Sequence, residues 1–461
     1  MIDIIAVTSY LVLLLAIGFL SKKYTTSKPE DYFLASRSFG KVLMLSTMAA
    51  TNFSAFFFLG FAGAAYKYGF GQYGIMGVGT ALMPIMFYVI GRKVWRLGKE
   101  RGYITPAELV GDRLGSRKLR LLFMAVMVAF TIPYLGVQAI GAGLMLNLVL
   151  GISVKVGAVL ALTIITFYIL LGGMRASSWT DVLQGVLMVL AILAAVFFVS
   201  KGLGGFEAAN LNAFDRAPEL FSRPGGEGYF TMQVWLSFML LWVFVDPMFP
   251  QLFSRFYTAR SEESLKFSMI AYPLVIALMF FSVVLIGVWA RGIDYEGAPD
   301  QVLPYMVKAY APEWVFALVM VGALAALMST ADSQLLALST MLSHDLELSN
   351  EVWKSRLISF TISMAALAYI ILGFDPAAGI FGTLVKTTFS GLVVLFPATY
   401  VALYRPKTSA LAVGASIILG EVSIVLFQWG WLPTYGFLDG MLALLVSAAA
   451  IFVLDPFTRR K

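Results

Sequence analysis

The amino-acid sequence predicts an all-α integral membrane protein with about 13 transmembrane helices. Of the 461 residues, 60% are hydrophobic and only 13% are charged, whereas soluble domains average about 45–50% apolar and about 25% charged residues. Apolar stretches of membrane-spanning length recur along the chain, with no soluble domain, linker or low-complexity segment between them. A globular protein of this size cannot bury so much apolar surface, so its solvent must be lipid.

A helix needs roughly 20 apolar residues to cross the hydrocarbon core of a bilayer. The stretches 119–150 and 314–342 are longer than that, so we expect a tilt or a kink in both, with Pro133 as a cause in the first. The longest polar segment, about 201–229, is rich in glycine and is predicted to be an external loop. The predicted spans are 3–20, 42–66, 74–91, 119–150, 154–171, 179–200, 230–252, 267–290, 314–342, 356–373, 382–404, 409–429 and 436–455.

The basic residues predict the orientation. With the N-terminus outside and the C-terminus in the cytoplasm, 25 of the 33 Lys and Arg residues fall in inner loops, Arg255 among them. Basic loops are retained in the cytoplasm, so we predict this topology in the plasma membrane, with an odd number of spans. The distribution also accounts for the net charge of +7 without nucleic acid as a partner.

Several classes of function are excluded by composition. The chain has no cysteine, which excludes disulfides, iron–sulfur clusters and thiolate metal sites. Its one histidine, His344, argues against a multi-histidine metal site. No nucleophile–base or metal constellation is evident, so we do not expect an enzyme. Asp3 precedes the first apolar stretch and Lys22 follows it, the reverse of the charge order of a cleavable signal peptide.

The second predicted span contains polar residues within an apolar stretch. Thr51, Asn52 and Ser54 lie there, followed by three phenylalanines and by Gly60. Polar groups in the hydrocarbon core are costly, and such clusters are functional candidates. The pattern is typical of a helix that breaks in the membrane, so that its freed carbonyls coordinate a cation and its second half points its N-terminus at an anionic group. Close helix packing through small residues is the structural alternative.

The ninth predicted span carries a stripe of oxygen-bearing residues. Its members are spaced i, i+3, i+4 and i+7, so they share one helix face: Ala326, Ser329, Thr330 and Ser333. Their hydroxyl and carbonyl oxygens suit an exchangeable Na⁺, by analogy with other hard cations. The adjacent Asp332 adds a carboxylate that packing does not require. Back-bonding of the hydroxyls to their own helix is the structural alternative.

Two further aspartates stand out. Asp181 lies about one turn into the sixth span, after a predicted cytoplasmic turn at Gly172–Arg175. We interpret it either as a second cation ligand or inner-gate residue, or as a helix cap. Asp246 lies within the seventh span, between Val245 and Pro247 and close to a second proline, and prolines interrupt a helix. It is interpreted either as a group that holds a cation or a substrate ammonium, or as structural.

Four segments are similar to a known family, in its order and at its spacing: AATNFSAFFFLG (49–60), GGMRASSWTDVLQ (172–184), PQLFSRFYTARS (250–261) and ALAALMSTADSQLLALSTMLSHDL (323–346). Over essentially its whole length the chain resembles the sodium/solute symporter family, whose members carry proline, sugars, sialic acid, pantothenate and monocarboxylates. The predicted topology matches this family too.

The resemblance implies the leucine-transporter fold, with two inverted five-helix repeats that each open with a broken helix. The repeats would span 42–200 and 230–404, joined by the external loop 201–229. An extra N-terminal helix and cytoplasmic loop would occupy 1–41, and two C-terminal helices with a cytoplasmic tail would occupy 405–461.

The resemblance also implies Na⁺ as the coupling ion, bound between the second and ninth spans by Ala50, Phe53, Ala326, Ser329 and Thr330. Ala50 and Phe53 would contribute backbone carbonyls.

Some members of the family bind a second sodium. Its ligands would match Asp181 together with Ser329, Asp332 and Ser333. This chain has Asp332 where a serine can occur, so it departs from the family's pattern at that site.

Substrate-binding positions are expected at Asn52, Phe57, Gln138 and Asp246. Sugar-carrying relatives have Gln and Glu where this chain has Phe57 and Met76, which disfavours a sugar. Proline-carrying relatives have an acidic residue at the position of Asn52. No mid-membrane arginine is evident to bind a carboxylate, but a helix N-terminus could do so. An amino acid such as proline and a small monocarboxylate remain the two leading solutes.

The sequence therefore predicts sodium-coupled symport of a small organic solute by alternating access. Two alternatives stay open. A proton-coupled carrier would use Asp181, Asp246 or Asp332 as its titrating group. A solute sensor of the same fold would bind without accumulating solute, and the lack of an attached signalling domain counts against it.

Overall fold

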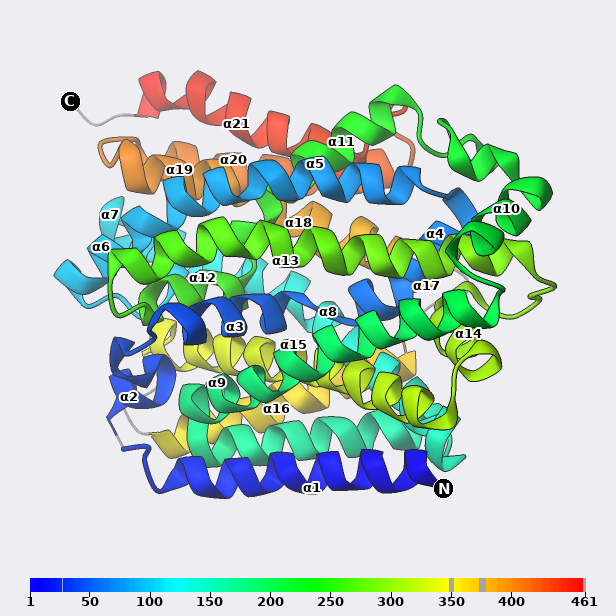
Figure 1. Cartoon of the computed structure of the whole chain (residues 1–461). Coiled ribbons are helices and arrows are strands. Elements are labelled where there is room, and N and C mark those ends of the chain that lie inside the picture. Colours follow the sequence, from blue (N-terminus) through cyan, green and yellow to red (C-terminus); the bar gives the residue numbers. More distant parts are fainter. Residues whose placement is uncertain (27, 348–351, 373–378, 459–461) are drawn as a thin grey trace.

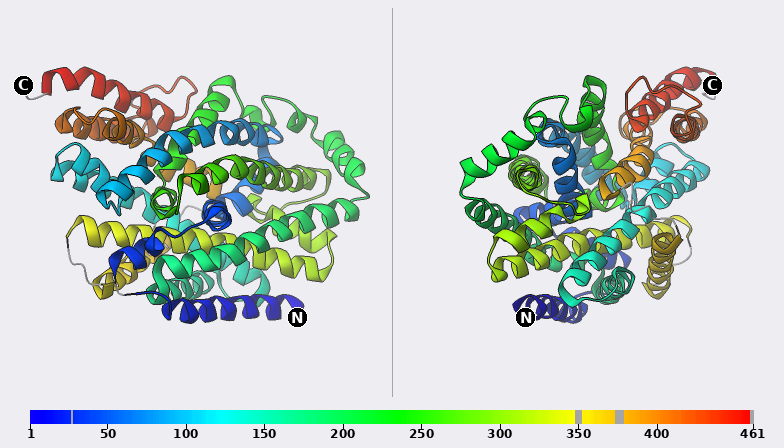
Figure 2. Two further views of the ribbon diagram at one scale, coloured as in Figure 1. Left: turned by 60° about the vertical axis from the view of Figure 1, so that its left-hand side comes forward. Right: turned by 90° about the vertical axis from the view of Figure 1, so that its right-hand side faces the viewer.

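The computed structural model is an all-helical bundle. It describes residues 1–26, 28–347, 352–372 and 379–458. Most helices run side by side along one direction, with α1 (Ile2–Lys22) along one face and α21 (Asp439–Thr458) along the opposite face (Figure 1). The start of α1 and the end of α21 lie at opposite ends of the bundle, as the left view of Figure 2 also shows. Opposite ends agree with an odd number of spans.

The membrane-length elements of the first half are α1, the broken helix α3 (Lys41–Asn52), η2 (Phe56–Phe61) and α4 (Ala62–Tyr68), the run α5 (Gly71–Met86), η3 (Phe87–Gly91) and α6 (Arg92–Arg101), then α8 (Arg117–Leu150) and α9 (Val154–Gly202). Those of the second half are the broken helix α11 (Met232–Val245), η6 (Asp246–Met248) and α12 (Pro250–Thr258), then α13 (Glu262–Trp289), α15 (Glu313–Asp345) and α16 (Val352–Leu372), the run α17 (Gly379–Leu384), η9 (Val385–Phe389), α18 (Ser390–Val393) and α19 (Phe396–Tyr404), and finally α20 (Ala410–Gln428) and α21.

Shorter elements connect these. The longer connecting helices are α2 (Pro29–Leu34), α7 (Pro106–Arg113), α10 (Phe206–Arg216) and α14 (Val302–Tyr310). The 3-10 turns are η1 (Ala35–Arg37), η4 (Pro218–Phe221), η5 (Gly226–Gly228), η7 (Ala290–Gly292) and η8 (Pro299–Gln301).

The number of spans depends on how bent helices are counted. By length and composition, the described residues contain eight helices able to cross a membrane, or ten if each broken pair is one span. Dividing α9 at its kink, and adding α16 and the continuous run Gly71–Gly91, restores the thirteen predicted spans. The predicted and observed bounds differ by a few residues at most ends. The expected kink at Pro133 is not seen as an interruption, because α8 is one α-helix through that residue.

Several spans begin where a hydroxyl residue caps the helix. An N-cap side chain accepts a hydrogen bond from a backbone N–H that has no partner within the helix. The caps of α8, α9, α11 and α13 are Ser116, Ser153, Thr231 and Ser261. Each marks the boundary between a polar connection and an apolar run, which is why the apolar pattern alone located these spans well.

The predicted cytoplasmic turn at Gly172–Arg175 is a kink within α9. Gly173 has φ +52° and ψ −137°, a conformation that only glycine adopts without strain, and the helix resumes at once. One glycine is thus enough to redirect the chain between the two spans predicted on either side of it. The kink lies against α2, where the Tyr32 hydroxyl donates to the carbonyl of Ile169 at 3.0 Å.

The segment 201–229 is more ordered than the predicted loop. It contains α10, whose buried Ala209 and Ala213 are small residues that permit close packing. Gly292 in η7 packs against the backbone at Ala213. Glycines near both ends of this segment had suggested irregular structure, but they only flank a short helix.

Two spans are broken within the bundle. α3 and the helix that begins at Phe56 are bent by 60°, and α11 and α12 are bent by 55°. At the first break the residue Phe53 has φ −74° and ψ +116°, which is extended backbone. At the second break Pro247 and Pro250 interrupt the helix, as expected from the sequence. In lipid the backbone groups freed at such breaks must find partners inside the protein.

We expect Gly173→Ala to destabilise the protein. The new Cβ would stand 2.4 Å from the carbonyl oxygen of Tyr32, and the left-handed backbone would be strained as well. Together these should cost at least about 2 kcal/mol, which thermal unfolding in detergent would register as a Tm lower by several degrees. Gly382→Ala is the control, since nothing lies within 4 Å of its added Cβ. Equal melting temperatures for both variants would contradict the left-handed backbone and the close contact with Tyr32 that are assigned to Gly173.

Candidate cation and solute site

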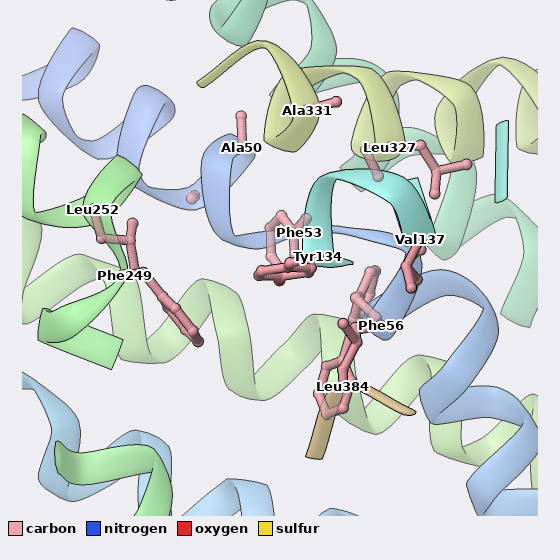
Figure 3. Close-up of a cluster of buried hydrophobic side chains, with 14 of the residues drawn as sticks. Ala50, Phe53, Phe56, Tyr134, Val137, Phe249, Leu252, Leu327, Ala331 and Leu384 are labelled. Atoms are coloured by element: carbon pink, nitrogen blue, oxygen red, sulfur yellow. The ribbon is translucent and has the colours of Figure 1, made fainter. Parts of the chain in front are cut away.

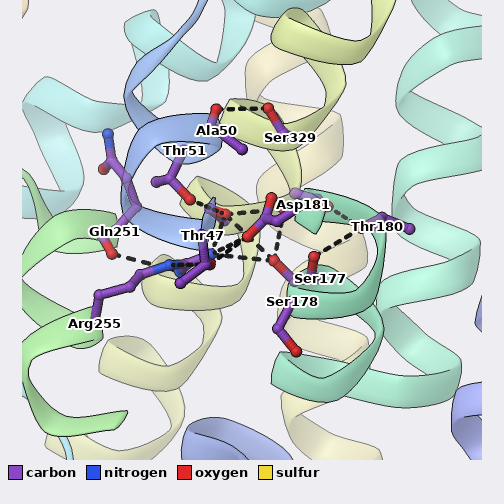
Figure 4. A network of polar contacts seen from close by, with 12 residues as sticks. Thr47, Ala50, Thr51, Ser177, Ser178, Thr180, Asp181, Gln251, Arg255 and Ser329 are labelled. Carbon is purple, nitrogen blue, oxygen red and sulfur yellow. Dashed lines mark hydrogen bonds and ion pairs between the residues drawn. The ribbon is translucent and has the colours of Figure 1, made fainter. Parts of the chain in front are cut away.

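The first break of α3 faces the centre of α15. The Ser329 hydroxyl donates to the carbonyl of Ala50 at 2.7 Å (Figure 4). The Thr330 hydroxyl donates to the carbonyl of Phe53 at 2.8 Å and to that of Thr51 at 3.0 Å. All of these residues are buried. The hydroxyls therefore satisfy carbonyls that lost their helical partners where α3 ends.

The fifth predicted residue lies in the same place. The carbonyl of Ala326 is 3.1 Å from the Ser329 hydroxyl, so the whole predicted sodium set converges at the break. It presents carbonyl and hydroxyl oxygens and no formal charge, which suits a hard monovalent cation. Simple back-bonding occurs lower on the same helix, where the Ser339 hydroxyl bonds to the carbonyl of Leu336. Ser329 makes such a bond to Ala326 as well, but the hydroxyls of Ser329 and Thr330 also reach across to α3.

One turn along α15 lies a buried ionic cluster. The Arg255 guanidinium, on α12, is 3.1 Å from a carboxylate oxygen of Asp181, on α9, and both side chains are fully buried. The guanidinium also donates to Ser333 at 2.6 Å and to Ser177 at 3.2 Å, and the Thr47 hydroxyl bonds to the same oxygen of Asp181. Figure 4 shows that the cluster joins side chains from α3, α9, α12 and α15.

Asp332 sits behind this ion pair, held by four hydroxyl groups. They belong to Tyr168 at 2.7 Å, Ser177 and Ser333 at 2.9 Å, and Thr180 at 3.3 Å. The cluster thus holds two carboxylates and one guanidinium. The second carboxylate oxygen of Asp181, Oδ1, is buried and has no hydrogen-bond partner among the described residues. The predicted second-sodium residues Asp181, Asp332 and Ser333 therefore lie together.

Two expectations about this region are wrong. Arg255 was expected in a cytoplasmic loop, and one interpretation of Asp181 was a helix cap. α12 continues as a helix after the second break, so Arg255 lies inside the bundle and not beyond it. Asp181 was interpreted as a helix cap in one alternative, but α9 is continuous on both sides of it and its carboxylate bonds to side chains of other helices.

The two breaks meet at a second polar group. Asn52, the last residue of α3, donates from its side-chain amide to Asp246 at 3.3 Å and also bonds to the Tyr272 hydroxyl. Asp246 opens η6 at the second break. Two of the predicted substrate residues are therefore in contact. Tyr272, on α13, was missed, because one tyrosine in a long apolar span carries no distinguishing signal.

The other two predicted substrate residues have different surroundings. The Gln138 side-chain oxygen accepts from the backbone N–H of Ala55 at 2.8 Å, so Gln138 braces the first break. Phe57 packs against Phe53 and Phe280, with ring centroids 4.8 Å apart in both pairs. Around the breaks lies an apolar cluster that Figure 3 shows, including Phe53, Phe56, Tyr134 and Phe249.

Comparison with known proteins gives this geometry a context. The chain is 27% identical to the sodium/pantothenate symporter of Escherichia coli, over 98% of this chain and 96% of that protein. It is 25% identical to the high-affinity proline transporter PutP of Bacillus subtilis, over 96% of both chains. The solved structure of a Na⁺-coupled sialic acid symporter, in a substrate-bound outward-open state, superposes with a TM-score of 0.83 at 17% identity and covers 99% of this chain and 98% of that one.

The structural likeness confirms the leucine-transporter-like fold expected from the sequence. The family model described as Sodium:solute symporter family matches residues 32–417, which include both breaks and the whole of α15. This multi-pass membrane protein therefore belongs to the sodium:solute symporter family and is a transporter, not an enzyme.

Proposed function

We propose that the protein imports a small organic solute, an amino acid such as proline or a small monocarboxylate, with Na⁺ bound at the first break of α3. The observation that carries the proposal is the convergence of Ala50, Phe53, Ala326, Ser329 and Thr330 on one buried point between α3 and α15. Sodium here is a co-transported ion.

The coupling follows from where the ion would bind. α3 ends at the break, and Asn52 is adjacent to Phe53, whose carbonyl is a proposed sodium ligand. Sodium would hold the break in the conformation in which Asn52 meets Asp246, so ion and solute would favour the same closed state. A ligand that bound the open and closed states equally well would not shift the equilibrium between them. The proposed moving units are two rigid bundles that are coupled where α3 meets α15. The proposed repeats, 42–200 and 230–404, each open with one of the broken helices.

The driving force comes from the membrane potential and the sodium gradient. One elementary charge moving through 100 mV contributes about 2.3 kcal/mol, to which the concentration ratio adds. We propose that the N-terminus is external and the C-terminus cytoplasmic. This orientation is supported by the basic connection around α6 and α7, which lies at the same end of the bundle as the end of α21 (Figure 1).

A second cation would fit near Asp181. One guanidinium cannot neutralise two buried carboxylates, and Oδ1 of Asp181 faces no donor among the described residues. Buried charges are normally paired. We therefore propose that the second sodium position lies beside this oxygen.

The identity of the solute cannot be inferred from the relatives. The two described above are named for pantothenate and proline, which differ in charge and size. A thermal-shift screen of the purified protein against metabolites, with sodium or with potassium, is the direct route to the solute. Proton coupling, the rival mechanism, would appear as pH-driven uptake that does not depend on sodium.

We expect Ser329→Ala and Thr330→Ala each to raise the sodium concentration that gives half-maximal uptake by roughly tenfold or more, the scale of one lost contact to a charged group. Uptake in proteoliposomes over a sodium titration measures it. Ser339→Ala removes a hydroxyl from the same helix that only back-bonds, and should leave the value unchanged. Unaltered sodium dependence in both test variants would remove the proposed site.

Asp181→Asn is expected to weaken or uncouple transport, because the variant loses the charge that holds both Arg255 and the proposed second cation. Parallel measurement of ²²Na⁺ entry and solute entry should show less solute carried per sodium. Glu421→Gln is the matched control: Glu421 is a carboxylate within α20 whose oxygens have no partner among the described residues, remote in sequence from this cluster. Identical ratios in wild type and Asp181→Asn would exclude a role in coupling.

A further inference from the structure

Asp246 is a buried carboxylate at the point where both helix breaks meet. Its side chain is 5% exposed, and its hydrogen-bond partner is the Asn52 amide, at the long distance of 3.3 Å. Asn52 is shared with the Tyr272 hydroxyl. A neutral amide at this distance compensates a buried negative charge poorly, and such a charge is normally paired with a cation.

The protein itself supplies no such cation. Among the described residues, no lysine, arginine or histidine lies within ion-pairing distance, 4.0 Å, of Asp246. Arg255, the buried arginine that follows on α12, is already engaged by Asp181 and Ser333. A cation from outside the chain would supply the missing positive charge.

Four backbone amides at the first break are already hydrogen-bonded within the protein and are not free to bind an anion. The N–H of Ala55 is taken by the Gln138 side chain at 2.8 Å, and the N–H of Phe56 by the Ser54 hydroxyl at 3.2 Å. The next two amides, of Phe57 and Phe58, bond to the carbonyl of Ser54. The N-terminus of the second half-helix, which could otherwise have bound a carboxylate, is therefore closed by its own neighbours.

Aromatic residues precede and follow Asp246 at the second break. Trp242 lies one helical turn before Asp246, and Phe249 lies three residues after it. Both pack on Phe389 with ring centroids 5.4 Å apart, and Phe249 lies 5.8 Å from Tyr134. The faces of aromatic rings attract ammonium groups and repel carboxylates. A carboxylate and a group of rings at the same helix break form a combination that suits a positively charged nitrogen.

We propose that Asp246 binds a positively charged nitrogen of the transported solute. The solute class is then a small amino acid or another compact ammonium compound, and carboxylates without a nitrogen are excluded. The inference rests on the proposed function, because the nitrogen would displace the Asn52 amide next to the sodium ligand Phe53.

The experiment is a thermal-shift measurement on the purified full-length protein with matched compounds, in sodium and in potassium. Each pair differs in the nitrogen: L-proline against cyclopentanecarboxylate, and L-alanine against propionate. Choline and glycine betaine extend the set of cations, together with the remaining common amino acids. We expect at least one nitrogen cation to raise the Tm in sodium and its nitrogen-free partner to have no effect.

The variants then test the residue. Asp246→Asn should weaken the affinity for the active compound at least about 30-fold, the scale of removing one partner of a buried charge pair, and Asp246→Glu should retain part of it. Asp246→Asn should still be stabilised by sodium alone, since the sodium ligands are intact, and this shows that the variant is folded. Glu421→Gln is again the control for loss of an intramembrane carboxylate.

Three results would overturn the inference: stabilisation by a nitrogen-free carboxylate, unchanged affinity in Asp246→Asn, or no response to any cation of the set. None of these results contradicts the proposed function if Ser329→Ala still raises the sodium concentration that gives half-maximal uptake of some solute. Conversely, wild-type protein that sodium does not stabilise, and uptake that sodium does not drive, would refute the proposed function whatever Asp246 binds.

Discussion

The structure depends on how the broken helix α3 satisfies its backbone inside the membrane. Where lipid surrounds a protein, a carbonyl without a partner is costly, so a helix can stop in mid-bilayer only where another element supplies donors. α15 supplies them through Ser329 and Thr330. The same contacts that make the break tolerable gather carbonyl and hydroxyl oxygens at one point. One set of atoms thus satisfies the freed backbone and offers ligands to a cation. This set links α3 to α15, the most buried of the long membrane-spanning helices.

α15 also orders the polar interior along its length. One turn beyond Ser329 and Thr330, Asp332 and Ser333 face the ion pair of Arg255 and Asp181. Two levels of polar contact are therefore stacked on one helix, the first uncharged and the second ionic. Both connect α15 to α3, which carries the first break. The ionic level connects it as well to α12, which follows the second. Movement at either break must therefore change contacts made by α15.

Much of this could be predicted from the sequence, for definite reasons. The spans follow from apolar length, and the residues of α15 share a face because helical periodicity is regular. Their convergence on α3 was expected only through the resemblance to a family, since spacing within one helix says nothing about which helix it meets. Arg255 was assigned to a loop because it follows two prolines, and a charged residue after a helix break normally marks the end of a span. Tyr272, Thr47 and Ser177 could not be found, because hydroxyl groups in apolar helices are common and only tertiary packing selects among them.

The placement of Arg255 on α12 has a consequence for a carrier that is empty. If α12 moved away from α9, the Arg255 guanidinium would move with it. The buried Asp181 carboxylate would then lose its counter-ion. That separation is unfavourable unless another positive ion arrives to replace the guanidinium. An unloaded molecule would consequently resist opening on this side, and leakage of solute or ions through an idle transporter would be suppressed by the arginine itself.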